Sequence, residues 1–325
     1  MKVHILDDWF DTLRGLPCFA KLAGHDVTVW TDHEPDPIRL AERLQEAEVL
    51  VLFRERTRIG VELLDRLPQL RLISQRSVYP HIDVRACTSN NVLLCSNMLS
   101  DTPSYAAAEL TLTLMLSSFR QIPEQVASIR DGNWQMGVGR TLRGRTLGLY
   151  GYGRIAGAVE AYAAALGMRV HWWGSDAGRA RAKADGKTVA ESRAAFFSTS
   201  DVVSLHVRLN PATKGVITAG DLAAMRPRSL LVNTSRSGLI SPGALEAEIE
   251  RGRIFAAIDV FDTEPMKDTR SILLTHPNVL PTPHIGYVTE DEFDLQFSDI
   301  FEQINAYAAG EPIHMINPEV WASQT

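Results

Sequence analysis

Three short segments in the second half of the chain each place one reactive side chain just after an apolar run. The segment NTSRSG carries Arg236, DVFDTEP carries Glu264 and TPHIG carries His284. An arginine can bind a carboxylate and polarise the neighbouring carbonyl, while a histidine exchanges a proton and a carboxylate favours its protonated form. With a hydride donor beside them, these three side chains form a set able to reduce a 2-keto acid.

Each of the three residues also has a purely structural explanation. A lone arginine is commonly a member of a surface ion pair, a lone histidine is commonly structural, and Glu-Pro in a loop often only ends a strand. Their joint occurrence downstream of a glycine-rich turn favours the catalytic interpretation. The predicted strand at 230–233 places Arg236 at the carboxyl end of a sheet, and Glu264 and His284 belong to loops after later strands.

The glycine-rich turn is GYGRIAG, which follows a predicted strand at 146–150 and opens a predicted helix at 155–166. This context is the one that a dinucleotide fingerprint requires. Gly151 permits the tight turn, Gly153 lets the backbone approach a pyrophosphate, and the start of the helix presents N–H groups to it. Ala156 stands where a third glycine is often found. An ordinary strand–helix turn is the alternative interpretation.

The sequence leaves the choice between NAD and NADP open. An NAD site has an acidic residue at the end of the second strand, about 20 residues after the glycine turn. Here Gly174 occupies that place and is followed by Ser175 and Asp176. Ser175, Arg179 or Arg181 could contact a 2′-phosphate, whereas Asp176 could instead serve the ribose.

Length and composition narrow the class of protein. A chain of 325 residues suggests two domains, and its apolar content of 45% is ordinary for a soluble globular protein. No apolar run approaches the roughly 18 residues of a membrane helix, and the N-terminal run is too short for a signal peptide. The net charge of −6 is well mixed and argues against a nucleic-acid partner. Three cysteines without metal-type spacing indicate a reduced, cytoplasmic protein and no metal site.

Short apolar runs alternate with amphipathic stretches along the chain, which predicts βαβ units and parallel sheets. Two successive doubly wound units fit this order. The predicted strands are residues 2–6, 26–30, 49–53, 70–74, 92–95, 146–150, 169–173, 201–206, 230–233 and 255–260.

Three further helices are predicted beside these strands. Residues 101–103 (DTP) form a helix-start signal, and the run at 104–119 is apolar nearly all round, so this helix should be buried, with a second subunit as one candidate to cover it. Ser241 and Pro242 are predicted to cap a helix at 243–251. The stretch at 290–309 is predicted to be helical.

Together these motifs resemble those of the D-isomer-specific 2-hydroxyacid dehydrogenase family, which includes phosphoglycerate dehydrogenase and glyoxylate/hydroxypyruvate reductase. The resemblance covers nearly the whole chain. Its most specific parts are GYGRI at 151–155, DVVSLH at 201–206, VNTSRSGL at 232–239, DVFDTEP at 259–265 and TPHIG at 282–286.

The resemblance implies an α/β fold of two doubly wound parallel-sheet domains. A Rossmann-type NAD(P)-binding domain, residues 101–287, would be inserted in a flavodoxin-like substrate domain made of residues 1–100 plus 288–325. A homodimer built through the nucleotide domain is also implied. The family's catalytic residues fall on Arg236, Glu264 and His284, and its cofactor contacts fall on Gly151, Tyr152, Gly153, Arg154, Ile155, Ser175, His206, Thr234 and Asp259.

The substrate loop departs from the family pattern. Relatives usually have Gly-Val-Gly or similar after the fourth strand, where this chain has Arg76, Ser77 and Val78 in a bulkier loop that runs to Asp83. In relatives an arginine-rich loop faces the substrate, and Arg54 belongs to a similar RERT segment here. With Arg76 it could hold a second anionic group, although exposed salt bridging is the commoner fate of such arginines.

These observations predict an NAD(P)-dependent oxidoreductase that interconverts a small 2-keto acid and the D-2-hydroxy acid, of glyoxylate/hydroxypyruvate or phosphoglycerate type. Arg236 would anchor the carboxylate, and His284 with Glu264 would move the proton. The alternative from another class is an NAD(H)-sensing, corepressor-like binding protein on the same fold. A hydrolase or methyltransferase on a Rossmann core would need a different catalytic set.

Overall fold

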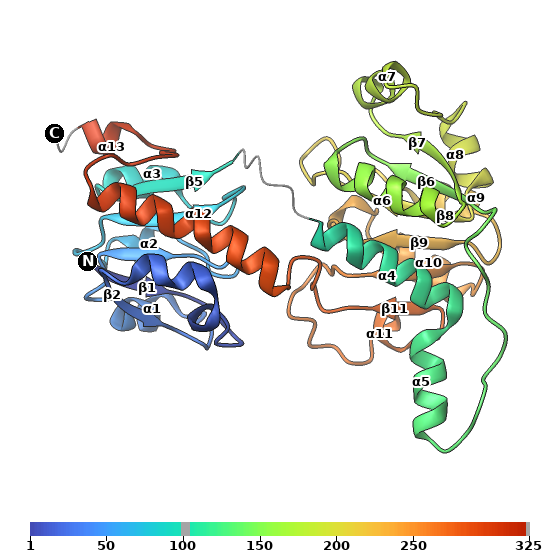
Figure 1. The fold of residues 1–325 in the computed structure, drawn as a ribbon, viewed down its shortest axis with the longest axis horizontal. Coiled ribbons are helices and arrows are strands. Elements are labelled where there is room, and N and C mark those ends of the chain that lie inside the picture. Colours follow the sequence, from blue (N-terminus) through green and yellow to red (C-terminus); the bar gives the residue numbers. More distant parts are fainter. Residues whose placement is uncertain (99–104, 323–325) are drawn as a thin grey trace. The chain divides into compact units, whose positions relative to one another are not determined.

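The computed structural model describes residues 1–98 and 105–322 and divides into two units (Figure 1). Unit 1 comprises Met1–Pro103 with Thr289–Thr325, and unit 2 comprises Ser104–Val288. The helix-start signal at 101–103 lies outside the described residues. In the part of the chain that is described, no helix has both the length and the apolarity to cross a membrane.

Unit 1 is a five-stranded parallel sheet with strand order β2-β1-β3-β4-β5, which is the flavodoxin-like order. The long C-terminal helix α12 packs on β4 and β5, so the end of the chain completes this unit. Its strands are β1 (Lys2–Ile5), β2 (Asp26–Val29), β3 (Val49–Val51), β4 (Leu72–Arg76) and β5 (Leu93–Asn97). Its helices are α1 (Pro37–Arg43), α2 (Val61–Leu64), α3 (Val84–Ser89), α12 (Glu290–Ala308) and α13 (Glu319–Ala322), with two 3₁₀ turns at Leu13–Gly15 and Pro17–Leu22.

Unit 2 is a six-stranded parallel sheet with strand order β11-β10-β9-β8-β6-β7. Its strands are β6 (Thr146–Tyr150), β7 (Arg169–Trp173), β8 (Val202–Leu205), β9 (Leu230–Asn233), β10 (Phe255–Ile258) and β11 (Val279–Pro281). Its helices are α4 (Ala106–Arg120), α5 (Ile122–Arg130), α6 (Arg154–Ala165), α7 (Asp176–Ala184), α8 (Arg193–Thr199), α9 (Ala219–Ala224), α10 (Ala244–Glu250) and α11 (Ile272–Thr275), with a 3₁₀ turn at Ser237–Leu239.

The strand order of unit 2 is of the Rossmann type. Val189 forms an isolated parallel bridge with Trp172 on the outer side of β7, in the place of a further strand. The chain leaves β6 toward β7 on one side and later returns to β8 on the other, so a topological switch point lies between β6 and β8. Ligands of doubly wound sheets bind at such a point, at the carboxyl ends of the strands. The predicted fold class of two doubly wound parallel sheets is therefore confirmed.

The two faces of this sheet are covered by different helices. Helices α4 and α6 contact each other on one face, and α8, α9 and α10 lie on the opposite face (Figure 1). Helix α4 buries Ala108, Leu114, Met115 and Phe119 but leaves Leu116 37% exposed, so the run predicted to be apolar nearly all round is buried on one side of the helix.

The predicted cap of α10 was wrong. The N-cap residue is Gly243, with a left-handed φ of 72°, and the helix begins at Ala244. The Ser241 hydroxyl instead donates to the Gly215 carbonyl at 3.1 Å. The local Ser-Pro signal was outweighed by a contact with a segment 26 residues earlier in the chain.

Candidate active site

Glu264 and His284 form a direct hydrogen-bonded pair. His284 Nδ1 lies 2.6 Å from Glu264 Oε2, and their side chains are 26% and 34% exposed. Burial opposes ionisation of Glu264, but the hydrogen bond from His284 and the N–H of Phe261, at 2.8 Å, outweigh it and hold the pKa of Glu264 below its usual value. The carboxylate is therefore ionised at neutral pH, and it can stabilise a positive charge on the imidazole.

Asp259, at the end of β10, anchors the loop that carries His284 through hydrogen bonds. The Asp259 carboxylate is fully buried and accepts hydrogen bonds from the Thr282 hydroxyl at 2.6 Å and from the N–H groups of Ile285 and Gly286, both at 2.8 Å. Burial raises the pKa of Asp259 despite these three donors. His284 itself has a left-handed φ of 54°. The hydrogen bonds to Asp259 thus anchor the backbone on both sides of His284, which itself adopts a conformation uncommon for residues other than glycine.

Arg236 follows β9, the neighbour of β10. Its backbone carbonyl accepts from the Asn233 side chain at 2.9 Å, and its Nη1 donates to the Ser235 carbonyl at 2.7 Å. The positive charge of Arg236 contributes to the lowered pKa of Glu264, after the contacts described above. Adjacent strands therefore bring Arg236, Glu264 and His284 to one edge of the sheet in unit 2.

The glycine turn lies at the switch point, between the ends of β6 and β8. Gly151 has φ 110°, and a Cβ atom there would lie 2.5 Å from the carbonyl oxygen of His206. Gly153, in contrast, has an extended backbone and open space where its Cβ would stand. The backbone just before α6 is therefore bare, as a site for a dinucleotide pyrophosphate requires.

Two further predicted cofactor residues flank this turn. The His206 imidazole lies 2.8 Å from the Ser204 hydroxyl, and burial lowers the pKa of His206 to about 4, so the ring is neutral at pH 7. Thr234, beyond β9, shares a 2.8 Å hydrogen bond with Thr111 of α4. On α6 itself, Arg154 is the first residue and Ile155 is 42% exposed.

The loop after β7 contains the residues that bear on the choice between NAD and NADP. Gly174 has φ 152°, which L-residues rarely adopt, so an acidic side chain there would be strained. Ser175 caps α7 and accepts from the Gly178 N–H at 3.2 Å. Arg179 binds the Gly174 carbonyl and the exposed Asp176 carboxylate, and its guanidinium lies 4.3 Å from the centroid of the Trp173 ring.

Tyr152 links the glycine turn to this second loop. Its backbone carbonyl lies 3.4 Å from Arg181 Nη2, and its hydroxyl binds Asp185 just beyond α7. The ring packs edge-on against buried Trp172, with centroids 4.8 Å apart. The structure thus brings all nine predicted cofactor residues to the carboxyl edge of the sheet or into the loops beside it.

The predicted substrate residues follow β3 and β4 in unit 1. Arg76 is nearly buried and forms an ion pair with Asp299 of α12 at 3.0 Å, so one side of its guanidinium is engaged within the unit. Arg54 and Ser77 both have left-handed backbones, with φ of 59° and 76°. Val78 is 37% exposed. Across residues 1–98 and 105–322, no cluster of His, Cys, Asp and Glu is arranged to hold a metal ion.

Two structural contacts of the site carried no signal in the sequence. Thr282 belongs to the TPHIG motif, but its hydrogen bond to Asp259 joins residues 23 positions apart. Thr111 sits within an apolar run, and its partner Thr234 lies 123 residues later. Pairings over such separations depend on the sheet order, which the local pattern does not contain.

Comparison with known proteins agrees with the fold. Residues 112–286 match the family model described as "D-isomer specific 2-hydroxyacid dehydrogenase, NAD binding domain". The chain belongs to the D-isomer-specific 2-hydroxyacid dehydrogenase family, as the motifs predicted.

The alignments with named relatives cover most of the chain. It is 34% identical over 276 residues to a D-3-phosphoglycerate dehydrogenase of Methanocaldococcus jannaschii, a match covering 84% of this chain and 52% of that one. It is 30% identical over 318 residues to a glyoxylate reductase of Thermococcus litoralis, covering 92% of each. The chain thus spans about half the length of the first relative and most of the second.

A solved structure shows the same fold over nearly the full length. A phosphoglycerate oxidoreductase from Vibrio cholerae superimposes with a TM-score of 0.89 at 42% identity, covering 95% of this chain and 99% of that one.

The two glycines of the turn are expected to respond differently to alanine. Gly151→Ala places a methyl group 2.5 Å from the His206 carbonyl at a positive φ and should lower the free energy of unfolding by roughly 2–4 kcal/mol. Gly153→Ala should leave stability within about 1 kcal/mol of the parent but weaken NADH and NADPH binding by at least roughly 10-fold. Denaturant unfolding and fluorescence titration measure the two effects. Unimpaired cofactor binding by Gly153→Ala would show that the pyrophosphate does not sit on this turn.

Proposed function

We propose that the protein is an NAD(P)-dependent oxidoreductase that transfers a hydride between the nicotinamide and a small 2-keto acid or D-2-hydroxy acid. The observation that carries the proposal is the 2.6 Å contact between His284 Nδ1 and Glu264 Oε2, beside Arg236 and on the same sheet edge as the glycine turn. The named relatives act on phosphoglycerate or glyoxylate, which supports a 2-keto or 2-hydroxy acid of that size.

The residues divide the reaction between them. Because Nδ1 of His284 is engaged by Glu264, Nε2 is the ring nitrogen that would face the substrate. In reduction it donates a proton to the oxygen that was the keto oxygen, and Glu264 stabilises the imidazolium before transfer. In oxidation the neutral ring accepts that proton. Arg236 anchors the substrate carboxylate, since a guanidinium fork fits it with two hydrogen bonds.

The bound cofactor supplies or accepts the hydride. The bare backbone at Gly151 and Gly153 fits its pyrophosphate, with Tyr152, Arg154 and Ile155 beside it. Ser175 and Arg181 flank the loop where an adenosine ribose would lie. In unit 1, Arg54, Ser77 and Val78 are proposed to contribute to substrate selection, together with the face of Arg76 that Asp299 leaves open.

Turnover on a panel of 2-keto acids tests this function. With glyoxylate, hydroxypyruvate and its phosphate as substrates, NADH or NADPH absorbance should fall for the parent protein. His284→Asn should lose at least roughly 100-fold in turnover because the proton relay is gone, while still binding cofactor. His314→Asn is the matched control, because His314 is exposed in unit 1 and has the same left-handed backbone (φ 55°) as His284 (φ 54°). Asparagine tolerates this conformation in both.

Loss of activity in both variants, or in neither, would contradict the role given to His284. If the parent protein binds the cofactor but turns over none of these substrates, the result would instead favour a nucleotide-sensing protein.

The pH dependence tests the role of Glu264. Because its pKa is held low, Glu264 keeps its charge across neutral pH and favours the protonated imidazole that reduction needs. Glu264→Gln removes that charge and keeps the shape, so the alkaline limb of the reduction profile should move to lower pH, with the rate near pH 8 falling by roughly 10-fold relative to the parent. Rates at acidic pH, where the imidazole is protonated in both, should change little. A profile that keeps its position would rule out the pairing as a functional one.

A homodimer built through unit 2 is part of the proposal. Helix α5 has no residue buried within the described protomer, and it exposes Ile122, Val126 and Ile129 at helical spacing. Figure 1 shows α5 and the following segment projecting from the rest of unit 2, and that segment exposes 72% of Trp134. An apolar stripe of this kind is characteristic of a subunit interface.

Ile129→Glu should convert a dimer into a monomer, because it places a charge in the apolar stripe. Light scattering after gel filtration measures the mass. Arg130→Glu, on the neighbouring exposed position, is the control and should remain dimeric. Equal masses for the two variants would place the interface elsewhere.

A further inference from the structure

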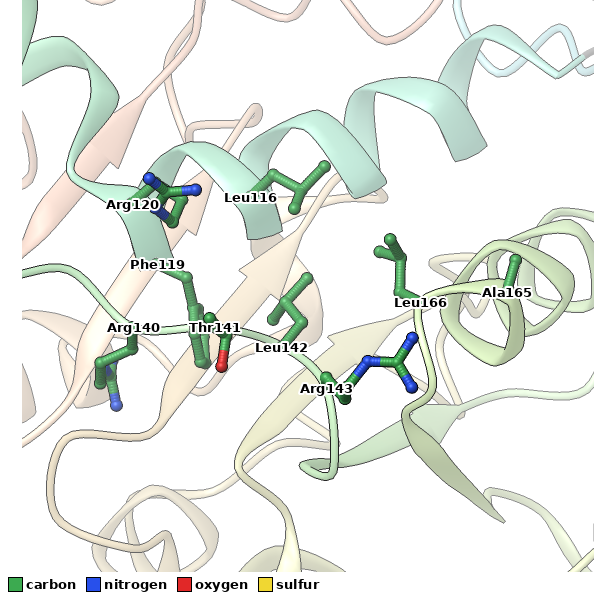
Figure 2. Close-up of a pocket in the computed structure, with 9 residues that line it drawn as sticks. All are labelled: Leu116, Phe119, Arg120, Arg140, Thr141, Leu142, Arg143, Ala165 and Leu166. Atoms are coloured by element: carbon green, nitrogen blue, oxygen red, sulfur yellow. The ribbon is translucent and has the colours of Figure 1, made fainter.

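Unit 2 contains a cavity of about 260 Å³ that lies away from the proposed active site. We call it the arginine pocket and define it by the nine lining residues labelled in Figure 2. Its walls come from the last turn of α4, the end of α6 and the segment at 140–143 that precedes β6. Its apolar lining is Leu116, Phe119, Leu142, Ala165 and Leu166.

The arginine pocket is at the amino edge of the sheet. Segment 140–143 leads into β6 and Leu166 leads toward β7, whereas the glycine turn and Arg236 follow the carboxyl ends of their strands. Parallel strands keep these two edges apart along the full length of the strands. A ligand in this pocket would therefore not touch the catalytic residues.

Three arginines, Arg120, Arg140 and Arg143, line the pocket, and no Asp or Glu is among its nine lining residues. In Figure 2, Arg120 and Arg143 lie on opposite sides of Leu142. The Arg143 guanidinium rests against the backbone of Gly167, where a Cβ atom would lie 3.0 Å from its Nη1. Arg120 and Arg143 thus place two positive charges beside an apolar floor, whereas the Arg140 guanidinium stacks on the Phe119 and Phe255 rings and donates to the Arg228 carbonyl.

Asp201, whose charge acts on Arg140, is already shared by other arginines. Asp201 lies 3.6 Å from Arg145 and 3.6 Å from Arg226. Burial, followed by the charges of Arg145 and Arg228, holds the pKa of Arg140 below its usual value. The pocket therefore belongs to a region crowded with positive charge, where a bound anion would relieve repulsion.

Stabilisation of helix ends does not account for all of this charge. The C-termini of α4 and α6 each carry about half a negative charge, and arginines are favoured beside them. Two such ends amount to roughly one charge. The guanidiniums of Arg120 and Arg143 amount to two positive charges, which exceeds that.

We infer that the arginine pocket binds a small organic anion, with a phosphate or carboxylate group held by Arg120 and Arg143 and a compact apolar body on Leu116, Leu142 and Leu166. Arginine forks suit both anionic groups, and a phosphate monoester, with its greater charge, is the better match to several guanidiniums. The cavity volume suits a ligand slightly smaller than those of usual ligand pockets, which begin at about 300 Å³.

Calorimetric titration of the full chain with phenyl phosphate tests this site, with benzoate and inorganic phosphate as comparison ligands. Phenyl phosphate should bind more tightly than either. Phenyl phosphate has more negative charge than benzoate. It also buries a ring that inorganic phosphate lacks, so its affinity should be roughly 10-fold higher than that of inorganic phosphate. Arg143→Ala and Arg120→Ala should each weaken its binding by about 10-fold. Both side chains are exposed, so the fold should tolerate their loss.

Three further variants separate the pocket from other anion sites. Ala165→Phe keeps every charge but fills the cavity, and it should abolish binding of phenyl phosphate. Two control variants should bind phenyl phosphate as the parent does: Arg39→Ala, at an exposed residue of α1 in unit 1, and Arg181→Ala, beside the glycine turn. Any of three results overturns the inference. The first is parent-like affinity in Arg143→Ala and Ala165→Phe, and the second is loss of binding in Arg181→Ala alone. The third is a parent affinity for phenyl phosphate weaker than about 10 mM. None of these measurements requires turnover, so they are independent of the proposed function.

Discussion

The buried carboxylate of Asp259 is the interaction on which the geometry of the proposed site depends. It lies at the end of β10, fully removed from solvent, and binds Thr282, Ile285 and Gly286. A buried charge is tolerated only when hydrogen bonds replace its water, and each such bond to a charged group contributes about 1.5–3 kcal/mol. Three donors from one short loop therefore fix that loop, and with it the position of the His284 ring beside Glu264.

The parallel sheet supplies the second constraint. Every strand of unit 2 runs in the same direction, so the loops after β6, β8, β9 and β10 emerge at one edge. At the switch point these loops are packed so closely that the His206 carbonyl leaves no room for a side chain at Gly151. Just before α6, in contrast, the backbone of Gly153 lies in open space. The same turn therefore combines close packing at Gly151 with accessible backbone at Gly153.

Positive charge is distributed differently at the two edges of this sheet. At the carboxyl edge, Arg236 is close enough to Glu264 to lower the pKa of that carboxyl, and it donates to the Ser235 carbonyl. At the amino edge, the arginine pocket has apolar residues and helix C-termini for neighbours, and Asp201 lies 3.6 Å from Arg145 and 3.6 Å from Arg226. The proposed catalytic arginine thus has a carboxylate in its own site, whereas the nine residues that line the arginine pocket include none.

Much of the fold and the placement of the proposed catalytic set could be predicted from the sequence because their signals are local. Apolar runs marked ten of the eleven strands in the described residues, and β11 was missed because only Val279 and Leu280 precede Pro281 there, whereas the equally short β3 opens a longer apolar run. Arg236, Glu264 and His284 stood out because each follows a strand within a few residues, and chain direction alone sends such residues to the carboxyl edge. The glycine turn was recognised for the same reason, since strand, turn and helix are consecutive.

Contacts between distant segments were decided only by the tertiary structure. The hydrogen bond between Thr282 and Asp259, the ion pair between Arg76 and Asp299, and the convergence of Arg120 with Arg143 join residues that no local pattern relates. Even the Ser241 cap failed because that hydroxyl found a partner on another loop. Sequence periodicity reports which face of a strand or helix is apolar, but it does not report which strand becomes its neighbour. For this protein, residue types and spacing determined the proposed chemistry, and the order of strands in the sheet decided how its residues are held.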